Sequence, residues 1–461
     1  MKDLTHGGEA KLLVLFSLPM LVGNVFQQFY NMVDSWVVGR YVGTEALAAV
    51  GVSFPIIFLT VALVMGLSMG SNVLIAQYYG AKDLRRVRAA IDTAYIVTFA
   101  ASAILTVIAL IATVPILRML RVPPSVMPQA TVYLRIIFSG MILSFGYNGV
   151  SAILRGLGDS ITPLFMLIVA TILNIILDLV FVRSFGWGVA GVAWATIIAQ
   201  GVAFIGSVIY LNLTHELLKT NFLKLHFDKK IFDLSLKIGI PSGAQQALVS
   251  LGLMFMSAVV NGFGPTVMAG FTAGSRIDSF VGMPAMNVSM ALSTFTGQNL
   301  GAGRPDRVRR GYKAALAIGL GITITLCTAL LLFGKQLVGI FSTDAEVVAL
   351  GSRYLAIIAP FYIAFTIMFV TNGLIRGAGE AIVPMFSTLL AMWLIRVPSA
   401  VIFSRLWGTD GIWWAMPTGW VVGMLVAVGY YRTGLWTKKA VAHTQRPLPD
   451  AVAAEVAVPV E

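Results

Sequence analysis

The sequence predicts an all-α integral membrane protein with twelve transmembrane helices, arranged as two parallel six-helix repeats around a central cleft. Three observations predict this fold. The 461-residue chain is 58% hydrophobic and only 11% charged, with a mean hydropathy of +0.86, which is typical of integral membrane proteins. It contains twelve apolar stretches long enough to cross a bilayer as helices. The second half of the chain also repeats motifs of the first half at a constant spacing.

Lys and Arg assign the loops to the two sides of the membrane. Most of the 32 Lys and Arg residues lie at the termini or in the loops after even-numbered spans. Cytoplasmic loops carry such an excess, so we expect a multi-pass protein of the inner (plasma) membrane with both termini in the cytoplasm. The twelve expected spans are residues 12–38, 52–79, 91–117, 131–154, 162–183, 188–212, 235–262, 268–297, 313–334, 347–374, 382–404 and 411–433.

Internal repeats divide the chain into two lobes. The segment QYYGAK at 77–82 recurs as QNLGAG at 298–303, 221 residues later. Tyr133-Leu134 recurs as Tyr354-Leu355, and LRGLGD at 154–159 recurs as IRGAGE at 375–380, at the same offset. Because six spans return the chain to the side where it began, the two repeats insert the same way round. We therefore predict an N-terminal lobe over 1–212, a cytoplasmic connecting loop over 213–237, a C-terminal lobe over 238–435 and a disordered cytoplasmic tail over 436–461.

The connecting loop has two readings. In one, it forms a short amphipathic helix on the membrane surface, with Leu217, Leu218, Phe222 and Leu225 dipping into the bilayer. In the other, it is a solvated linker.

The first span carries polar residues that a lipid-facing helix would not tolerate. Gln27, Tyr30, Asn31 and Asp34 share one helix face, because they are spaced i, i+3, i+4 and i+7. A carboxylate near mid-membrane costs roughly 2.5–3.5 kcal/mol on insertion scales, so Asp34 should face a cavity or a partner. Pro19 lies two turns or more earlier and removes a backbone hydrogen bond, so it is a candidate hinge. The alternative is a structural aspartate that pairs inside the bundle.

Further oxygen donors lie in the fifth and sixth spans. Asn174 and Asp178 are spaced i, i+4 and share a face, as do Thr196 and Gln200. Carboxylate, amide and hydroxyl oxygens suit a hard cation such as Na⁺, and nearby carboxyl groups also suit a proton relay. The alternative for Asn174 and Asp178 is a hydrogen-bond pair that holds the lobe together.

The second half has fewer such residues. Gln245, Met256 and Met286 are candidates for lining a cleft, although such residues are also ordinary packing. Arg276 and Asp278 lie two residues apart in span 8, so they do not face each other on a helix. No nucleotide-binding loop, HExxH motif or Cys-pair zinc spacing is present. We therefore expect no enzyme activity and no cofactor, and an ion gradient as the energy source.

These features resemble the MATE (multidrug and toxic compound extrusion) family. The resemblance rests on the two six-span repeats, the loop QYYGAKD with its echo QNLGAGR, and the paired LRGLGD and IRGAGE turns, and it covers about residues 10–435. The polar set of the first lobe is similar to the DinF-like prokaryotic branch. This resemblance implies that Asp34, Asn174, Asp178 and Thr196 converge on a cation-coupling site. It also implies that Gln27, Tyr30 and Asn31 border the substrate cleft. The acidic residue that the NorM-like branch has in span 7 is absent.

The resulting hypothesis is an efflux antiporter, a monomer in the lipid bilayer, that exports organic cations or amphiphiles in exchange for H⁺ or Na⁺ by alternating access. It has no nucleic-acid partner. Its predicted substrate cleft comprises Gln27, Tyr30, Asn31, Gln200, Gln245, Met256, Met286 and Asp278. One alternative is a major facilitator carrier, whose basic loop motif after span 2 is not matched here. Another is a lipid-linked precursor flippase, which typically lines its cleft with several cations.

Overall fold

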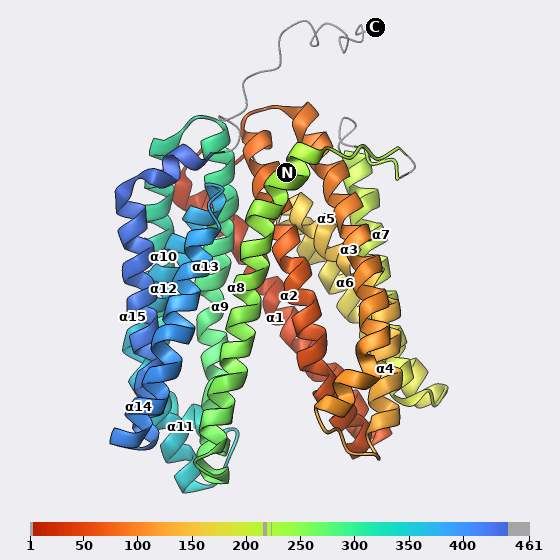
Figure 1. The fold of residues 1–461 in the computed structure, drawn as a ribbon, viewed down its shortest axis with the longest axis vertical. Coiled ribbons are helices and arrows are strands. Elements are labelled where there is room, and N and C mark those ends of the chain that lie inside the picture. The colour runs from red at the N-terminus through yellow and green to blue at the C-terminus, as the bar shows by residue number, and fades with distance from the viewer. Residues whose placement is uncertain (1–2, 215–218, 223, 441–461) are drawn as a thin grey trace, which may run out of the picture.

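The computed structural model describes residues 3–214, 219–222 and 224–440, and within these ranges every regular element is a helix. Figure 1 shows the helices running side by side along the long axis of the molecule. The N-terminal half contains α1 (Glu9–Val37), η1 (Val38–Val42), α2 (Thr44–Gly80), α3 (Leu84–Met119), α4 (Met127–Ser139), α5 (Met141–Gly156), α6 (Ile161–Asp178), η2 (Leu179–Ser184) and α7 (Gly188–Thr214).

The C-terminal half follows the same order of long helices and breaks. It contains α8 (Lys229–Asn261), α9 (Pro265–Gly301), α10 (Pro305–Gly339), α11 (Ala345–Ile358), η4 (Ala359–Phe361), α12 (Tyr362–Gly377), α13 (Ile382–Leu389), η5 (Leu390–Arg396), α14 (Val397–Trp407), α15 (Thr409–Thr433) and η6 (Leu435–Lys439). The π-helical turn η2 ends its span and η5 interrupts the equivalent span between α13 and α14, and such turns are frequent at functional sites. η2 begins directly after Asp178, and η5 ends at Arg396.

The helices account for the twelve predicted spans. Over the described part of the chain, ten segments are long and apolar enough to cross a membrane. An eleventh is the pair α4–α5, whose helices bend by 49° at a short break. α9 is as long as α2, with 37 residues each, but many Ser, Thr, Asn and Gln residues make it less apolar. It holds the position in the second half that α2 holds in the first, and it completes the twelve.

The first helix of each half packs against the other half. α1 contacts α9 and α10, and α8 lies along α2. The α2–α8 contact is close because Gly66 faces Gly243 and Gly70 faces Ser235, where an added methyl group would overlap the backbone of α8. In Figure 1 these two helices lie together near the top and separate toward the bottom. We call the top, which carries residues 3–8, 81–83, 302–304 and 434–440, the terminal face.

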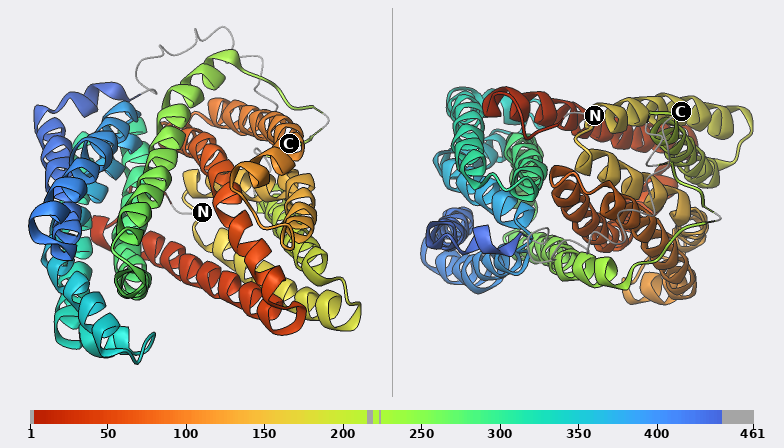
Figure 2. Two further views of the ribbon diagram at one scale, coloured as in Figure 1. Left: turned by 60° about the horizontal axis from the view of Figure 1, so that its bottom comes forward. Right: turned by 90° about the horizontal axis from the view of Figure 1, so that it is seen from above.

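The turned views in Figure 2 show the same crossed arrangement from two other sides. The C-terminal half, in cyan and blue, lies to one side, and most of the N-terminal half lies to the other. The red α1 extends from the first group to the second. The two halves therefore contact each other through α1 and α8, and also through α2 and α9.

The connecting loop is shorter than predicted. Asp228 accepts hydrogen bonds from the backbone N–H groups of Lys230 and Ile231, and this cap starts α8 at Lys229, not near residue 238. Phe222 does not dip into lipid from a surface helix. Its ring packs on Tyr95, with centroids 5.2 Å apart, and the described loop residues are not helical. The described part of the loop, residues 219–222 and 224–228, thus docks on α3. Leu217 and Leu218 lie outside the described residues.

The predicted tail also begins too early. Residues 435–439 form a 3-10 helix, and Trp436 is buried against the core of the C-terminal half. The large apolar surface of the indole explains why the chain stays packed past the last span. Lys439 Nζ lies 2.9 Å from Glu380 Oε2, and this hydrogen bond raises the pKa of the lysine. Residues 441–461 of the predicted tail lie outside the described part.

Truncation of Asp159 tests the cap that begins α6. One carboxylate oxygen of Asp159 accepts hydrogen bonds from the backbone N–H groups of Ile161 and Thr162, both at 3.0 Å. Asp159→Ala is expected to lower the free energy of unfolding by about 1–2 kcal/mol, because these two N–H groups at the start of the helix lose their acceptor. Reversible denaturation in detergent measures the change. Asp306→Ala, at an exposed position in the first turn of α10, is the control. Equal losses in both variants would contradict the cap.

Candidate functional site

Four predicted site residues come together inside the N-terminal half. Asp34 lies on α1, Asn174 and Asp178 on α6, and Thr196 on α7. Asp34 is 8% exposed, and Asn174 and Asp178 are fully buried. The i, i+4 spacing of Asn174 and Asp178 presents both side chains on the face of α6 that packs toward α1 and α7. The cluster therefore combines residues from three helices that are far apart in sequence.

Asn174 connects the three helices. In the orientation that satisfies both ends of its amide, the nitrogen donates to Asp34 Oδ1 at 2.9 Å. The amide oxygen accepts from the backbone N–H of Thr196 at 3.3 Å. Tyr30, one turn before Asp34, donates its hydroxyl to Thr196 Oγ1 at 3.0 Å. The side chain of Asp34 is thus oriented by Asn174, and the hydroxyl of Thr196 is oriented by Tyr30.

The two carboxyl groups are neighbours. Asp34 and Asp178 lie within hydrogen-bonding reach of each other, and Asp178 Oδ1 has no hydrogen-bond partner among the described residues. None of the ion pairs within the described ranges involves either residue. Two adjacent buried carboxylates repel each other when both are ionised, so the pair favours a bound proton or metal cation. The geometry can therefore hold one positive charge.

Tyr133 belongs to this site, and the sequence argument gave it no role. It lies buried on α4, close enough to Asp34 and Asp178 to interact with both electrostatically. Its repeat partner, Tyr354, donates its hydroxyl to Asp278 Oδ2 at 3.1 Å. The repeated Tyr-Leu pair therefore marks an equivalent position in the two halves, where a buried tyrosine lies beside a membrane carboxyl group.

The predicted cleft residues divide into two groups. Gln27, Tyr30 and Asn31 lie on the same helix as Asp34, Gln200 follows Thr196 on α7, and Met286 is 41% exposed. Met256 is fully buried in the core of the C-terminal half, and the prediction that it borders a cleft is wrong in this conformation. Its side chain fills the packed side of α8.

Gln245 also points away from any open cleft. It is 6% exposed, donates to Thr388 Oγ1 at 2.8 Å and accepts from Arg376 Nη2 at 2.8 Å. The amide thus compensates a buried guanidinium inside the C-terminal half, and the cleft prediction is corrected here too. Because both ends of the Gln245 amide are hydrogen-bonded, its side chain is held in one orientation.

Asp278 does not join the first site. It lies half-buried on α9, bonded to Tyr354 of α11, and its backbone carbonyl accepts from Tyr362 at 3.1 Å. Arg396, buried at the end of η5, interacts with it electrostatically. Pro19 lies inside α1, which continues unbroken on both sides of it. The hinge at Pro19 and the roles of these cleft residues remain predictions.

Comparisons with known proteins agree with this architecture. A family model described as MatE matches the chain twice, over residues 19–180 and 241–402, which together exceed half its length. The chain is 33% identical over 434 residues to the "Probable multidrug resistance protein YpnP" of Bacillus subtilis (strain 168), covering 94% of this chain and 97% of that protein.

Solved structures give the same result. The chain resembles one titled "Crystal structure of MATE in the bent conformation" with a TM-score of 0.89 at 25% identity, over 95% of this chain and 98% of that one. It resembles another titled "Crystal structure of MATE in the straight conformation" with a TM-score of 0.85 at 25% identity, over 96% and 99%. The two family matches also coincide with the two halves described above, and the DinF-like branch remains a prediction. The chain therefore belongs to the MatE family, the multidrug and toxic compound extrusion transporters that its repeated motifs resemble.

Proposed function

We propose that this transporter is a secondary antiporter that exports organic cations and amphiphiles in exchange for H⁺ or Na⁺ by alternating access. The observation that carries the proposal is the neighbouring pair Asp34 and Asp178, buried in a membrane span without a bonded cationic side chain among the described residues. Ionisable groups at such depth are functional by default. Multidrug resistance, named for the relative from Bacillus subtilis, supports the substrate class.

Competition for one negative site couples the two fluxes. A proton or Na⁺ at Asp34 and Asp178 neutralises the charge that attracts an organic cation. The ion and the substrate then each favour the conformation that binds it more tightly, which is sufficient for exchange. Carboxylates, the Asn174 amide and the Thr196 hydroxyl supply oxygen atoms of the kind that Na⁺ takes. The same carboxyl groups serve a proton equally well.

Bending of α1 is the proposed mechanical step. Pro19 interrupts the backbone hydrogen bonds of α1, the helix that carries Asp34. Binding or release of the ion at Asp34 therefore bends α1 at Pro19, where the helix is weakest. The existence of relatives solved in conformations titled bent and straight supports a fold with two accessible shapes. We place the terminal face in the cytoplasm, because exposed Lys82, Arg85 and Arg309 lie there. The protein acts as a monomer in the inner membrane.

Transport in proteoliposomes tests the proposal. With an imposed pH gradient in sodium-free buffer, the wild type is expected to move a fluorescent lipophilic cation. Asp34→Asn and Asp178→Asn are each expected to reduce this movement at least about tenfold, because the neutral amide removes the negative charge shared by ion and substrate. Asp410→Asn, which changes a half-buried carboxylate paired with Arg353, is the control.

The outcomes separate the alternatives. Transport that appears only with a sodium gradient would identify Na⁺ as the coupling ion and would still agree with the proposed site. Unaltered transport in both aspartate variants, with normal expression, would overturn the site. Silence of the wild type under both gradients would favour the flippase alternative; the major facilitator alternative is already removed by the family match.

Asn174→Ala tests the amide that holds Asp34. Loss of the 2.9 Å hydrogen bond leaves the carboxyl group free to turn, so the half-saturating concentration of the coupling ion should rise about three- to tenfold. The maximal rate should change less. Asn148→Ala is the matched control, because that amide donates only to a carbonyl of its own helix. An unchanged ion dependence in Asn174→Ala would exclude the amide from the ion site.

Pro19→Ala tests the bend. The substitution restores a backbone hydrogen bond in the middle of α1, and transport should slow several-fold while equilibrium binding of the lipophilic cation persists. Pro115→Ala, inside α3, is the control for removal of a proline from a long helix. Normal transport by Pro19→Ala would remove the bending step and leave the ion site intact.

A further inference from the structure

Two glutamines outside the ion site connect the halves at the terminal face. Gln77 lies near the end of α2, and Gln298 occupies the equivalent place near the end of α9. Both side chains are fully buried. They begin the repeated motifs QYYGAK and QNLGAG, and neither the ion site nor the proposed coupling uses them.

Their hydrogen bonds are reciprocal. Gln77 Nε2 donates to the carbonyl of Gly377 at 3.0 Å, and Gln298 Nε2 donates to the carbonyl of Gly156 at 3.0 Å. Gly156 and Gly377 are the last residues of α5 and α12, where carbonyl groups have no partner within their own helix. Each half therefore completes a helix end of the other half, and separation would remove both bonds together.

Two glycines make this approach possible. An added methyl group at Gly80 would overlap the backbone oxygen of Gln298, and one at Gly301 would overlap the backbone oxygen of Gln77. The ends of α2 and α9 thus touch backbone to backbone, which places the glutamine side chains within reach of the opposite helices. The repeated Q-x-x-G pattern is explained by this contact.

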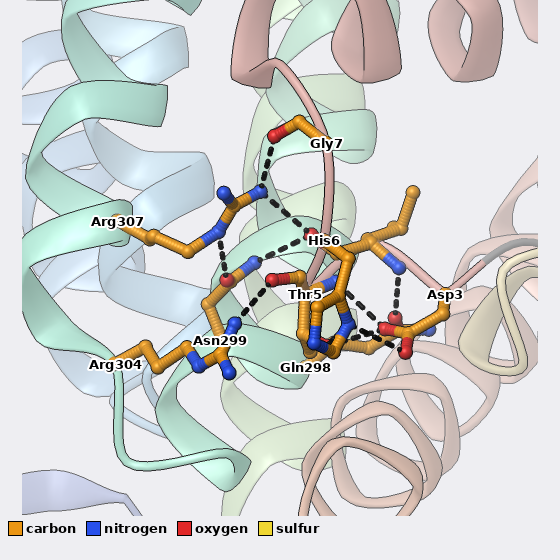
Figure 3. Close-up of polar contacts among 9 residues, drawn as sticks. Asp3, Thr5, His6, Gly7, Gln298, Asn299, Arg304 and Arg307 are labelled. Atoms are coloured by element: carbon orange, nitrogen blue, oxygen red, sulfur yellow. Dashed lines mark hydrogen bonds and ion pairs between the residues drawn. The ribbon is translucent and has the colours of Figure 1, made fainter.

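Residues 3–8, which precede α1, form hydrogen bonds in the same region, and Figure 3 shows these contacts. The backbone N–H of Leu4 donates to Gln298 Oε1 at 3.0 Å, so this amide is held at both ends. Arg304 Nη1 donates to the carbonyl of Thr5 at 2.8 Å, and Arg307 Nη2 donates to that of Gly7 at 3.0 Å. The Leu4 side chain is 1% exposed and packs in the core of the C-terminal half.

The contacts between halves are concentrated near the terminal face. One side-chain hydrogen bond is described between α1 and α9, from Asn24 to Asn287 at 3.0 Å. Asp34 lies almost three turns farther along α1. The described hydrogen bonds that join α2 to the C-terminal half use Ser71, Asn72 and Gln77, all in its last ten residues.

We propose that Gln77 and Gln298 form a two-fold latch, secured by residues 3–8, that holds the halves shut at the terminal face. Its release is the step that opens the Asp34–Asp178 site toward that face. The inference rests on the alternating access of the proposed function. It assigns to the two repeated motifs a role in gating, separate from the binding of ion or substrate.

Distance measurements between spin labels test the latch without any substrate. Labels on cysteines at the exposed positions Arg85 and Arg309, in a Cys327→Ala background, report the separation of the halves at the terminal face. Gln77→Ala and Gln298→Ala are each expected to raise the separated population about tenfold, since each leaves a buried carbonyl without its donor.

Matched controls separate the latch from general destabilisation. Gln129→Ala on α4 truncates a glutamine whose Oε1 has no hydrogen-bond partner among the described residues, and it should leave the distances unchanged. Gly80→Ala should wedge the halves apart, whereas Gly51→Ala on the same helix meets no atom within 4 Å. If Gly80→Ala does not fold, the two glutamine variants decide. Wild-type distances in both glutamine variants would overturn the latch.

The failure of the latch and the failure of the proposed function are distinguishable. Separated labels in Gln77→Ala and Gln298→Ala, together with a wild type that moves no lipophilic cation, would keep the latch and reject the substrate. Unchanged labels, together with coupled transport that depends on Asp34, would keep the antiporter and reject the latch.

Discussion

The structure depends on a balance between two buried carboxyl groups and the apolar bundle that encloses them. Asp34 and Asp178 cannot both stay ionised and adjacent in such surroundings without a positive charge nearby. The described part of the chain supplies no bonded cation, so in the proposed mechanism the coupling ion supplies this charge. The amide of Asn174 and the backbone of Thr196 prepare a place for it by fixing the orientation of Asp34. The rest of the N-terminal half provides the helices that hold these groups in register.

The two halves share a fold but differ in the charge at their centres. Each half sets a buried tyrosine, Tyr133 or Tyr354, beside a membrane carboxyl group. In the first half, a second carboxyl group completes the site. In the second half, the buried guanidinium of Arg396 lies near Asp278 instead. A permanent side-chain cation reduces the need for a diffusible one, which accounts for why ion coupling is assigned to the first half.

The fold could be predicted because hydropathy and repeated motifs are visible in the sequence itself, whereas the convergence of Asp34, Asn174, Asp178 and Thr196 was implied only by the family resemblance. Hydropathy and the repeat offset predict the spans, and helical spacing places Asn174 beside Asp178 on one face. Prediction from the sequence failed where the outcome depends on which face of a long helix meets which neighbour. Met256 and Gln245 lie on the packed side of α8, and the pattern of that apolar span does not distinguish its faces. The docking of Phe222 on Tyr95 depends on an aromatic contact across more than a hundred residues, which composition does not reveal.

The segments that precede the first helix of each half attach to the opposite half. Residues 3–8 bind around α9 and α10, and the backbone N–H groups of His226 and Asp228 bond to Asp92 and Thr93 on α3. This exchange has a consequence for biosynthesis. A ribosome makes the chain from its N-terminus, so residues 3–8 and the face of α1 that meets α10 emerge long before their partners exist. The contacts of residues 3–8 and of α1 with the other half therefore form only after much of the C-terminal half has been synthesised, so the last step of folding joins the two repeats.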